Sequence, residues 1–260
     1  MNTYQLWISF YTMLRKDIVR MFRIWVQTFL PSVVTSVLYF TVFGSILGSR
    51  IGEMQGVDYM SFVVPGLVML AIVTSAYANT SFMFFSSKFF ARSIDEILVS
   101  PTPPWLLIGG FVAGGVVRGV LVGALVLIVS LFFTGLSLSI YNALVIFGFA
   151  LLTAVVFALA GLVNGIYAKS IDGINLVPTF VLTPLVYLGG IFYSVHTLPD
   201  WWQAITYANP LFYLINGFRY GFLGIADVPL AVSLGVLSVL IIVLIAINWY
   251  FIRTGLGLRQ

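Results

Sequence analysis

The chain has no cysteine, one histidine and few charged residues. Of its 260 residues, 8% are charged and 61% are hydrophobic. The absence of cysteine excludes disulfides, thiolate metal ligands and cysteine nucleophiles. One histidine without a cluster of carboxylates argues against a zinc site, so we expect no metal in this chain. The mean hydropathy of +1.10 is that of an integral membrane protein.

Two further absences bear on function. The long apolar runs contain no Asp or Glu, whereas carriers driven by protons or sodium generally bind the coupling ion through carboxylates within the membrane. An ion-coupled carrier stays open as an alternative, because Pro65-Gly66, Pro178 and Pro184 could break helices and free carbonyls to bind sodium. The sequence also has no Gly-Lys pair, hence no Walker A loop. If ATP drives this protein, another chain must bind it.

A membrane hydrolase is a further alternative. It would depend on His196, which lies beside Thr197 with Asp200 four residues further on. The sequence has no second histidine and no G-x-S-x-G elbow to hold a serine nucleophile. We therefore expect no catalytic residue, and we interpret His196 as a bystander.

Six apolar stretches are long enough to cross about 30 Å of hydrocarbon as helices. An even number of spans places both termini on one side of the membrane. Most Lys and Arg residues fall on that side, which the positive-inside rule assigns to the cytoplasm; only Arg50 and Arg219 lie opposite. The scattered basic residues form no nucleic-acid-binding surface. Residues 1–260 are thus predicted to be a single all-α membrane domain, with spans at about 25–48, 61–85, 105–133, 143–166, 174–193 and 229–252.

Residues 1–24 are predicted to form an amphipathic helix at the cytoplasmic membrane interface. Apolar residues from Trp7 to Trp25 recur at helical spacing, and polar and basic residues, Lys16 and Arg20 among them, occupy the opposite face. Such a helix could be a membrane anchor, or a lever that joins a cytoplasmic partner to the first span.

The third span carries glycines at four-residue spacing and one arginine. Small residues on one stripe let helices pack closely, although a glycine-lined substrate passage is an alternative. Arg118 lies well inside this span, and burying it unpaired costs about 2.5–3.5 kcal/mol, so it must face protein or water. Either it contacts an anionic or polar substrate in the pathway, or it reaches the cytoplasm or the carbonyls of a neighbouring helix. The glycines are Gly110, Gly114, Gly115, Gly119 and Gly123.

The cytoplasmic loop from Ser86 to Gly110 contains a short helix. Ser93 is suited to the N-cap, Asp95 and Glu96 suit the first turn, and Pro101 ends the helix after about two turns. On a solvated connector, Ile94, Ile97 and Leu98 would expose apolar surface. We therefore interpret this helix as a docking element.

The segment 195–229 is too broken to span the membrane and too apolar to be a free loop. Trp201 and Trp202 suit the membrane interface, while Pro199 and Pro210 bound a turn. Backbone that leaves the helix at membrane depth must be surrounded by protein or water. We predict a re-entrant helical hairpin on the outer face of the pathway, acting as a gate or lid.

Two motifs resemble one known family. The loop, in which a basic residue and an acidic turn precede S-P-x-x-P-W-x-x-x-x-G, is similar to the coupling-helix region of ABC-2 type permeases, the membrane subunits of ABC exporters. The segment GGIFYSVHTLPDWWQAITYANPLFYLINGFRYGFLG resembles the C-terminal motif of that family. Its matching positions are Gly190, Phe192, Leu198, Pro199, Trp201, Asn209, Pro210, Leu211, Tyr213 and Arg219.

The resemblance covers nearly the whole chain and implies how it works. It implies a homodimer in the bacterial inner membrane, surrounded by lipid, that binds two copies of a cytoplasmic ATPase carrying the ATP and Mg. The cargo would be amphipathic, lipid-like or a drug, with glycan or lipid-linked glycan export as the alternative. The ATPase would contact Arg92, Ser93, Ile94, Asp95, Glu96, Ile97, Leu98 and Pro101. The gate would comprise Leu198, Pro199, Trp201, Asn209, Pro210, Tyr213 and Arg219.

Overall fold

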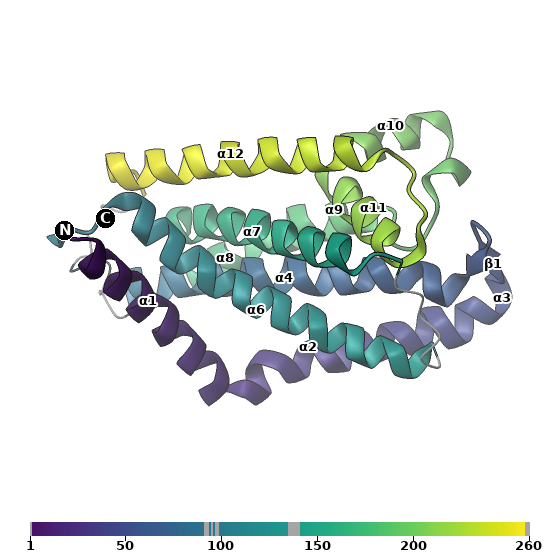
Figure 1. Cartoon of the computed structure of the whole chain (residues 1–260), viewed down its shortest axis with the longest axis horizontal. Helices are drawn as coiled ribbons and strands as arrows, with labels where there is room; N and C mark the ends of the chain where they lie inside the picture. The colour runs from purple at the N-terminus through teal and green to yellow at the C-terminus, as the bar shows by residue number, and fades with distance from the viewer. Residues whose placement is uncertain (1, 91–93, 95, 97–98, 135–140, 258–260) are drawn as a thin grey trace.

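A computed structural model describes residues 2–90, 94, 96, 99–134 and 141–257. The described residues are almost entirely helical, which confirms an all-α protein. Most of the long helices run lengthwise along the molecule, and the two termini lie together at one end (Figure 1). This arrangement agrees with the predicted position of both termini on one side of the membrane.

The N-terminal helix α1, Thr3–Arg23, confirms the predicted amphipathic helix. It ends at an elbow at Ile24, and α2, Trp25–Tyr39, continues at an angle to it (Figure 1). One face of α1 lies on the bundle. Met13 contacts Gly110 and Asp17 contacts Gly114, and both glycines lie on helix α6, Pro104–Phe133. Trp7 and Tyr11 remain exposed. The helix is therefore docked on protein as well as suited to the membrane interface.

The first span is irregular. After α2 the chain passes through a π-helical segment, η1 at Phe40–Gly48, and a short helix, α3 at Ser49–Ile51, so that helix extends from residue 25 to residue 51. A two-stranded antiparallel hairpin follows, with β1 at Glu53–Met54 and β2 at Val57–Asp58. The Asp58 carboxylate then accepts a hydrogen bond from the Met60 amide and begins the next helix.

The centre of the bundle is α4, Tyr59–Phe89, which packs against α6, Pro104–Phe133, and α7, Ala143–Tyr167. Glycines make this close approach possible. A Cβ on Gly119 would meet Ala76 and the Ile72 carbonyl, and a Cβ on Gly161 would overlap the Tyr77 carbonyl. In the structure, the glycine stripe of the third span serves helix packing.

Among the described residues, five helices are long and apolar enough to cross a membrane: 25–51, 59–89, 104–133, 143–167 and 230–254. The predicted span at 174–193 has a different form. Its helix covers only residues 171–187, as α8 at Ile171–Val177, the π-helical η2 at Pro178–Leu182, and α9 at Thr183–Tyr187. The described part of the chain therefore holds five candidate spans and one shorter, broken helix.

The segment before the last helix folds as a helical hairpin at the end of the molecule opposite the termini (Figure 1). A short 3₁₀ turn, η3 at Val195–Thr197, leads into α10, Asp200–Ala208, and α11, Pro210–Leu223. Pro199 and Pro210 precede and begin these helices, as expected for residues that cannot donate a backbone hydrogen bond. The last helix, α12, spans Leu230–Thr254.

Candidate transport groove

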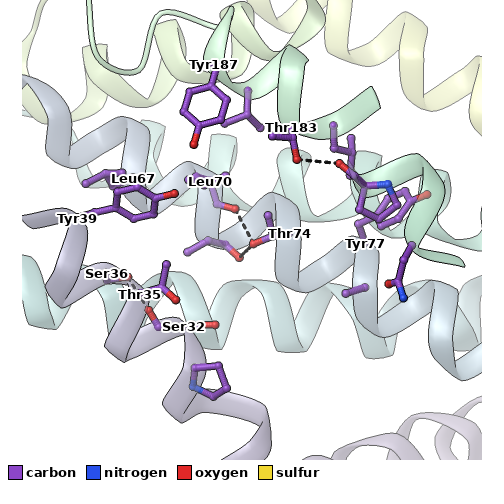
Figure 2. Close-up of a pocket in the computed structure, with 17 residues that line it drawn as sticks. Ser32, Thr35, Ser36, Tyr39, Leu67, Leu70, Thr74, Tyr77, Thr183 and Tyr187 are labelled. Atoms are coloured by element: carbon purple, nitrogen blue, oxygen red, sulfur yellow. Dashed lines mark hydrogen bonds between the residues drawn. The ribbon is translucent and has the colours of Figure 1, made fainter. Parts of the chain in front are cut away.

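A groove opens between α2, α4 and the broken helix α8–η2–α9 (Figure 2). Its volume is about 430 Å³. The side chains labelled in Figure 2 project into the space from both sides, with Ser32 and Thr35 on α2 facing Thr183 and Tyr187 on the broken helix. The other lining residues are Pro31, Ser36, Tyr39, Leu67, Leu70, Ala71, Thr74, Tyr77, Ala78, Asn175, Pro178, Leu182 and Val186.

The groove is apolar but carries many hydroxyl groups. Several hydroxyls use their proton within their own helix: Ser36 Oγ donates to the Ser32 carbonyl, Thr74 Oγ1 to the Leu70 carbonyl and Thr183 Oγ1 to the Pro178 carbonyl. Their oxygen lone pairs can still accept hydrogen bonds. No Asp, Glu, Lys or Arg is among the described residues that line the groove. The groove thus suits a neutral or amphipathic molecule.

Helix α4 shows how the groove is made. It is buried along most of its length, but Thr74 and Ala78, one turn apart, are exposed and line the groove. Beside them Tyr77 is 2% exposed, and its hydroxyl has no hydrogen-bond partner among the described residues. A buried hydroxyl without a partner is costly.

Aromatic rings lie near the end of the groove that is close to the hairpin. Phe192 stacks on Phe43 at a centroid distance of 4.3 Å, with Tyr187 at 6.1 Å and Tyr39 at 6.4 Å. The Tyr59 hydroxyl donates to the Phe192 carbonyl at 3.2 Å. Phe192 is one of the motif residues, and its place here links the motif to the groove.

Behind this aromatic cluster lies a buried polar network centred on Arg219 and Asp227. Arg219 is 2% exposed, donates to the Gly190 carbonyl at 2.7 Å and lies 3.9 Å from the Phe62 ring centre. Its ion pair with Asp227 is 3.5 Å long. Burial lowers the pKa of Arg219 to about 10, and the negative charge of Asp227 opposes that shift, so Arg219 stays charged at neutral pH.

His196, interpreted as a bystander, has a polar partner. Its Nε2 lies 3.3 Å from the Asp227 carboxylate, which also accepts a hydrogen bond from Gln55 Nε2 at 2.9 Å. Gln55 donates to Ser194 Oγ as well, at 2.7 Å. The histidine is therefore part of the outer polar network, and the acid it contacts is Asp227 rather than the Asp200 of the hydrolase alternative.

The predicted gate residues build the hairpin rather than line the groove. Asn209 accepts from the Leu211 amide and donates to the Leu185 carbonyl at 2.6 Å, which ties α11 to α9. The Tyr213 hydroxyl donates to the Tyr207 carbonyl at 2.8 Å, and Trp201, 61% exposed, stacks on Trp202. The Leu198 carbonyl accepts from Gln203, and Pro199 and Pro210 stand at the helix starts. Arg219 fixes α11 to the backbone at Gly190.

The predicted ATPase contacts are only partly described. Arg92, Ser93, Asp95, Ile97 and Leu98 lie outside the described residues. Glu96 and Pro101 are exposed. Ile94, predicted to contact the ATPase, is 2% exposed and packs with Phe84, Leu107 and Phe111 inside this chain.

Arg118 lies outside the lining of the groove. Its guanidinium points between helices, with Nη1 3.3 Å from the Asn79 side-chain oxygen and Nη2 3.5 Å from the Thr28 carbonyl. This is the arrangement expected if the arginine binds polar groups of neighbouring helices.

Sequence reasoning missed the groove. A signal was present, because Ser32, Thr35, Ser36 and Tyr39 recur every three or four residues and so share one face of a predicted span.

The fold and the groove define a multi-pass membrane protein with a binding-sized groove between its helices. The chain belongs to the ABC-2 type transporter family, which matches residues 8–223. It is 52% identical over 256 residues to the inner membrane transport permease YadH of Escherichia coli K12, covering 98% of each chain. It is 27% identical to nodulation protein J of Rhizobium leguminosarum bv. viciae, covering 85% of this chain and 84% of that protein. The protein is thus a multi-pass transport permease of the inner membrane, and its family implies association with an ABC ATPase.

Proposed function

We propose that this chain is the membrane subunit of an ATP-driven exporter, in which two copies form the pathway and each binds one cytoplasmic ATPase that holds ATP and Mg. The observation that carries this proposal is the uncharged, hydroxyl-bearing groove between α2, α4 and α8–η2–α9. ATP binding would close the ATPase pair and tilt the spans from an inward-open to an outward-open arrangement.

The groove favours an amphipathic, lipid-like or drug substrate. Its wall combines apolar side chains with hydroxyls and, within the described lining, no charge, so a charged solute would lose its hydration without gaining a partner. Export of a glycan or lipid-linked glycan is the second candidate. It is favoured by Tyr39, Tyr187 and Phe192, whose rings gather near one end of the groove and present flat apolar faces beside phenolic hydroxyls.

A second copy of the chain is proposed to cover the groove. The groove is flanked by large exposed apolar side chains, including Val34 and Leu38 on α2 and Phe180 and Val181 on η2. Lipid could solvate these residues. A facing copy would instead close the open side of the groove, and water and solutes would then reach the resulting pathway only from its ends. The exposed apolar side chains beside the groove are the reason for proposing the homodimer.

The same proposal includes the membrane arrangement. Residues 171–187 would make the sixth crossing, with Pro178 and the π-helical η2 allowing a short, broken helix to do so within a protein-lined pathway. Both termini would lie in the cytoplasm, where most basic residues fall. Hairpin α10–α11 would then be re-entrant on the outer face and act as the gate.

The ATPase is proposed to dock on the loop between α4 and α6. Glu96 is exposed there and Val99 is 88% exposed, so this loop offers both an acidic and an apolar contact. Ile94, which is buried within the chain, would anchor the loop to the bundle so that a movement of the ATPase is passed to α4 and α6.

The transport groove is tested by filling it. Ala78→Trp places a large ring in the groove from α4, whereas Ala246→Trp places one on an exposed alanine of α12, away from the groove. In proteoliposomes with the copurified ATPase, we expect Ala78→Trp to lower ATP-dependent export at least about tenfold, which corresponds to a rise of about 1.4 kcal/mol in the barrier to transport.

Ala246→Trp should leave export unchanged, and both variants should retain the bound ATPase. Equal export by the two variants would show that the groove is not the pathway. Transport without the ATPase that follows an imposed ion gradient would instead favour the ion-coupled carrier.

A further inference from the structure

A second polar site lies where α1, α4 and α6 meet, outside the groove. The Asp17 carboxylate accepts hydrogen bonds from Arg20 Nη2 at 3.0 Å and from Asn79 Nδ2 at 2.8 Å. The Asn79 side-chain oxygen accepts from Arg20 Nη2 at 2.8 Å and from Arg118 Nη1 at 3.3 Å. We call Asp17, Arg20, Asn79 and Arg118 the elbow cluster, because they lie close to the elbow between α1 and α2.

The elbow cluster has more positive than negative charge. It holds two guanidinium groups and one carboxylate, and Asp17 is the only described acid that forms an ion pair with either arginine. One positive charge is therefore left without a counter-charge from the described part of the chain. Asp17 and Asn79 are 5% and 0% exposed, so the centre of the cluster is shielded from water, and an unbalanced charge beside it is costly.

Arg118 is the cation whose needs are met least well. Its contact with Asn79 is 3.3 Å long and its contact with the Thr28 carbonyl is 3.5 Å long, at or beyond the far limit of a good N–H···O bond. Its Nε is buried and has no partner among the described residues. A guanidinium has five donors, so Arg118 can donate to a further oxygen-bearing ligand.

A cavity of about 240 Å³ adjoins the cluster. Lys16 and Asp17 on α1 line it, with Met83 on α4 and Phe111 on α6, and its remaining wall is Thr12, Met13, Ser87 and Gly110. It thus combines a third cation, the Asp17 carboxylate and hydroxyls with an apolar wall. Arg20 is 28% exposed, so a ligand can reach the cluster from outside.

The depth of the site matches the headgroups of one membrane leaflet. Arg118 contacts the carbonyl of Thr28, which lies in the first turn of the first span. Trp25, at the start of that span, is 60% exposed, and exposed tryptophans prefer the interface between headgroups and hydrocarbon. In the membrane arrangement proposed above from the distribution of Lys and Arg, the leaflet at this end of the bundle is the cytoplasmic one.

We propose that Lys16, Arg20 and Arg118 bind the phosphate of an anionic phospholipid from this leaflet, with the start of an acyl chain against Met83 and Phe111. The lipid would supply the missing negative charge and would hold α1 against α6. This inference does not depend on the transport cargo or on the ATPase. It makes the elbow cluster a lipid site rather than a part of the pathway.

Lipid binding is measured on the purified full chain in neutral detergent, without the ATPase. Phosphatidylglycerol is added, with phosphatidylcholine as the neutral control, and the thermal unfolding midpoint and the number of lipids retained in native mass spectrometry are recorded. We expect phosphatidylglycerol to raise the midpoint and phosphatidylcholine to have little effect. Inorganic phosphate at matched concentration should also have little effect.

Variants assign the effect to the cluster. Lys16→Gln changes an exposed side chain, and we expect it to bind phosphatidylglycerol about fivefold to tenfold more weakly, the loss expected for one basic group near an anionic lipid. Arg118→Gln should lose more, and Arg118→Lys should recover part of the binding. Arg50→Gln removes an exposed arginine at the opposite end of the bundle and should bind as the parent does.

Three results would overturn the proposal. If phosphatidylglycerol stabilises the parent no more than phosphatidylcholine, the cluster serves only to fix α1 to the bundle. If inorganic phosphate stabilises it equally, the site takes a soluble anion and not a lipid. If Lys16→Gln and Arg118→Gln, once folded, keep the full response, the lipid binds elsewhere.

Discussion

At the scale of single residues, glycines decide how closely the helices approach. Gly161 on α7 lies against the backbone of α4, so that a Cβ there would overlap the Tyr77 carbonyl oxygen. A backbone atom in the middle of a helix cannot move aside as a side chain can. Gly148 lies on the same helix, and apart from the backbone of that helix and the adjoining residues, no described atom lies within 4 Å of the position of a Cβ there. The two residues therefore form a matched pair.

Gly161→Ala should therefore destabilise the protein by about 1–3 kcal/mol, the usual cost of overpacking a well-packed interior. Gly148→Ala should be neutral or slightly stabilising, because alanine favours the helix over glycine. The measurement is the thermal unfolding midpoint of each purified variant in the same detergent. Equal midpoints for the two variants would contradict the close α4–α7 contact.

Residue-scale contacts are also where sequence reasoning was weakest. Arg118 could be assigned to protein or water from its cost in lipid, but its contacts, Asn79 and Thr28, lie 39 and 90 residues away in sequence. Asp17 was placed within an interfacial helix, yet it is buried against Gly114. Such pairings are set by how helices pack, which single-helix periodicity does not contain.

At the scale of elements, apolar length predicts the spans well where the helix is continuous. Four helices, α4, α6, α7 and α12, match the predicted stretches 61–85, 105–133, 143–166 and 229–252 within a few residues at each end. The stretch 174–193 was predicted less well. Hydropathy does not register that Pro178 opens a π-helical segment or that the helix ends at Tyr187.

Helix α2 carries the proposed contact between copies. Because the chain has no cysteine, single cysteines can be introduced without removing native ones. We expect Val34→Cys on α2 and Phe180→Cys on η2 to give disulfide-linked dimers on mild oxidation in the membrane. Both side chains are exposed beside the groove, and a facing copy would bring equivalent positions near the two-fold axis.

Ile242→Cys, on the exposed face of α12, serves as the control and should stay monomeric on a non-reducing gel. Crosslinking of Ile242→Cys with none at Val34 and Phe180 would show that the copies meet through α12. The groove would then face lipid, and the enclosed pathway would have to be abandoned.

At the scale of the whole molecule, the two ends have different tasks. The end with the termini carries α1, the elbow cluster and the loop proposed to meet the ATPase, while the other end carries hairpins β1–β2 and α10–α11 and the Arg219–Asp227 network (Figure 1). Helix α4 and the groove connect them. The permease family could be predicted from its motifs, whereas the groove and the lipid site required the packed structure.

The central claim is that the chain works as the membrane subunit of an ATP-driven exporter. The direct measurement is to purify it in mild detergent from its native membrane, identify the accompanying protein and determine the ratio of the two. We expect a nucleotide-binding ATPase in equal amounts, and loss of that ATPase with Glu96→Lys on the exposed part of the loop. Recovery of the intact permease with no nucleotide-binding partner would contradict the account.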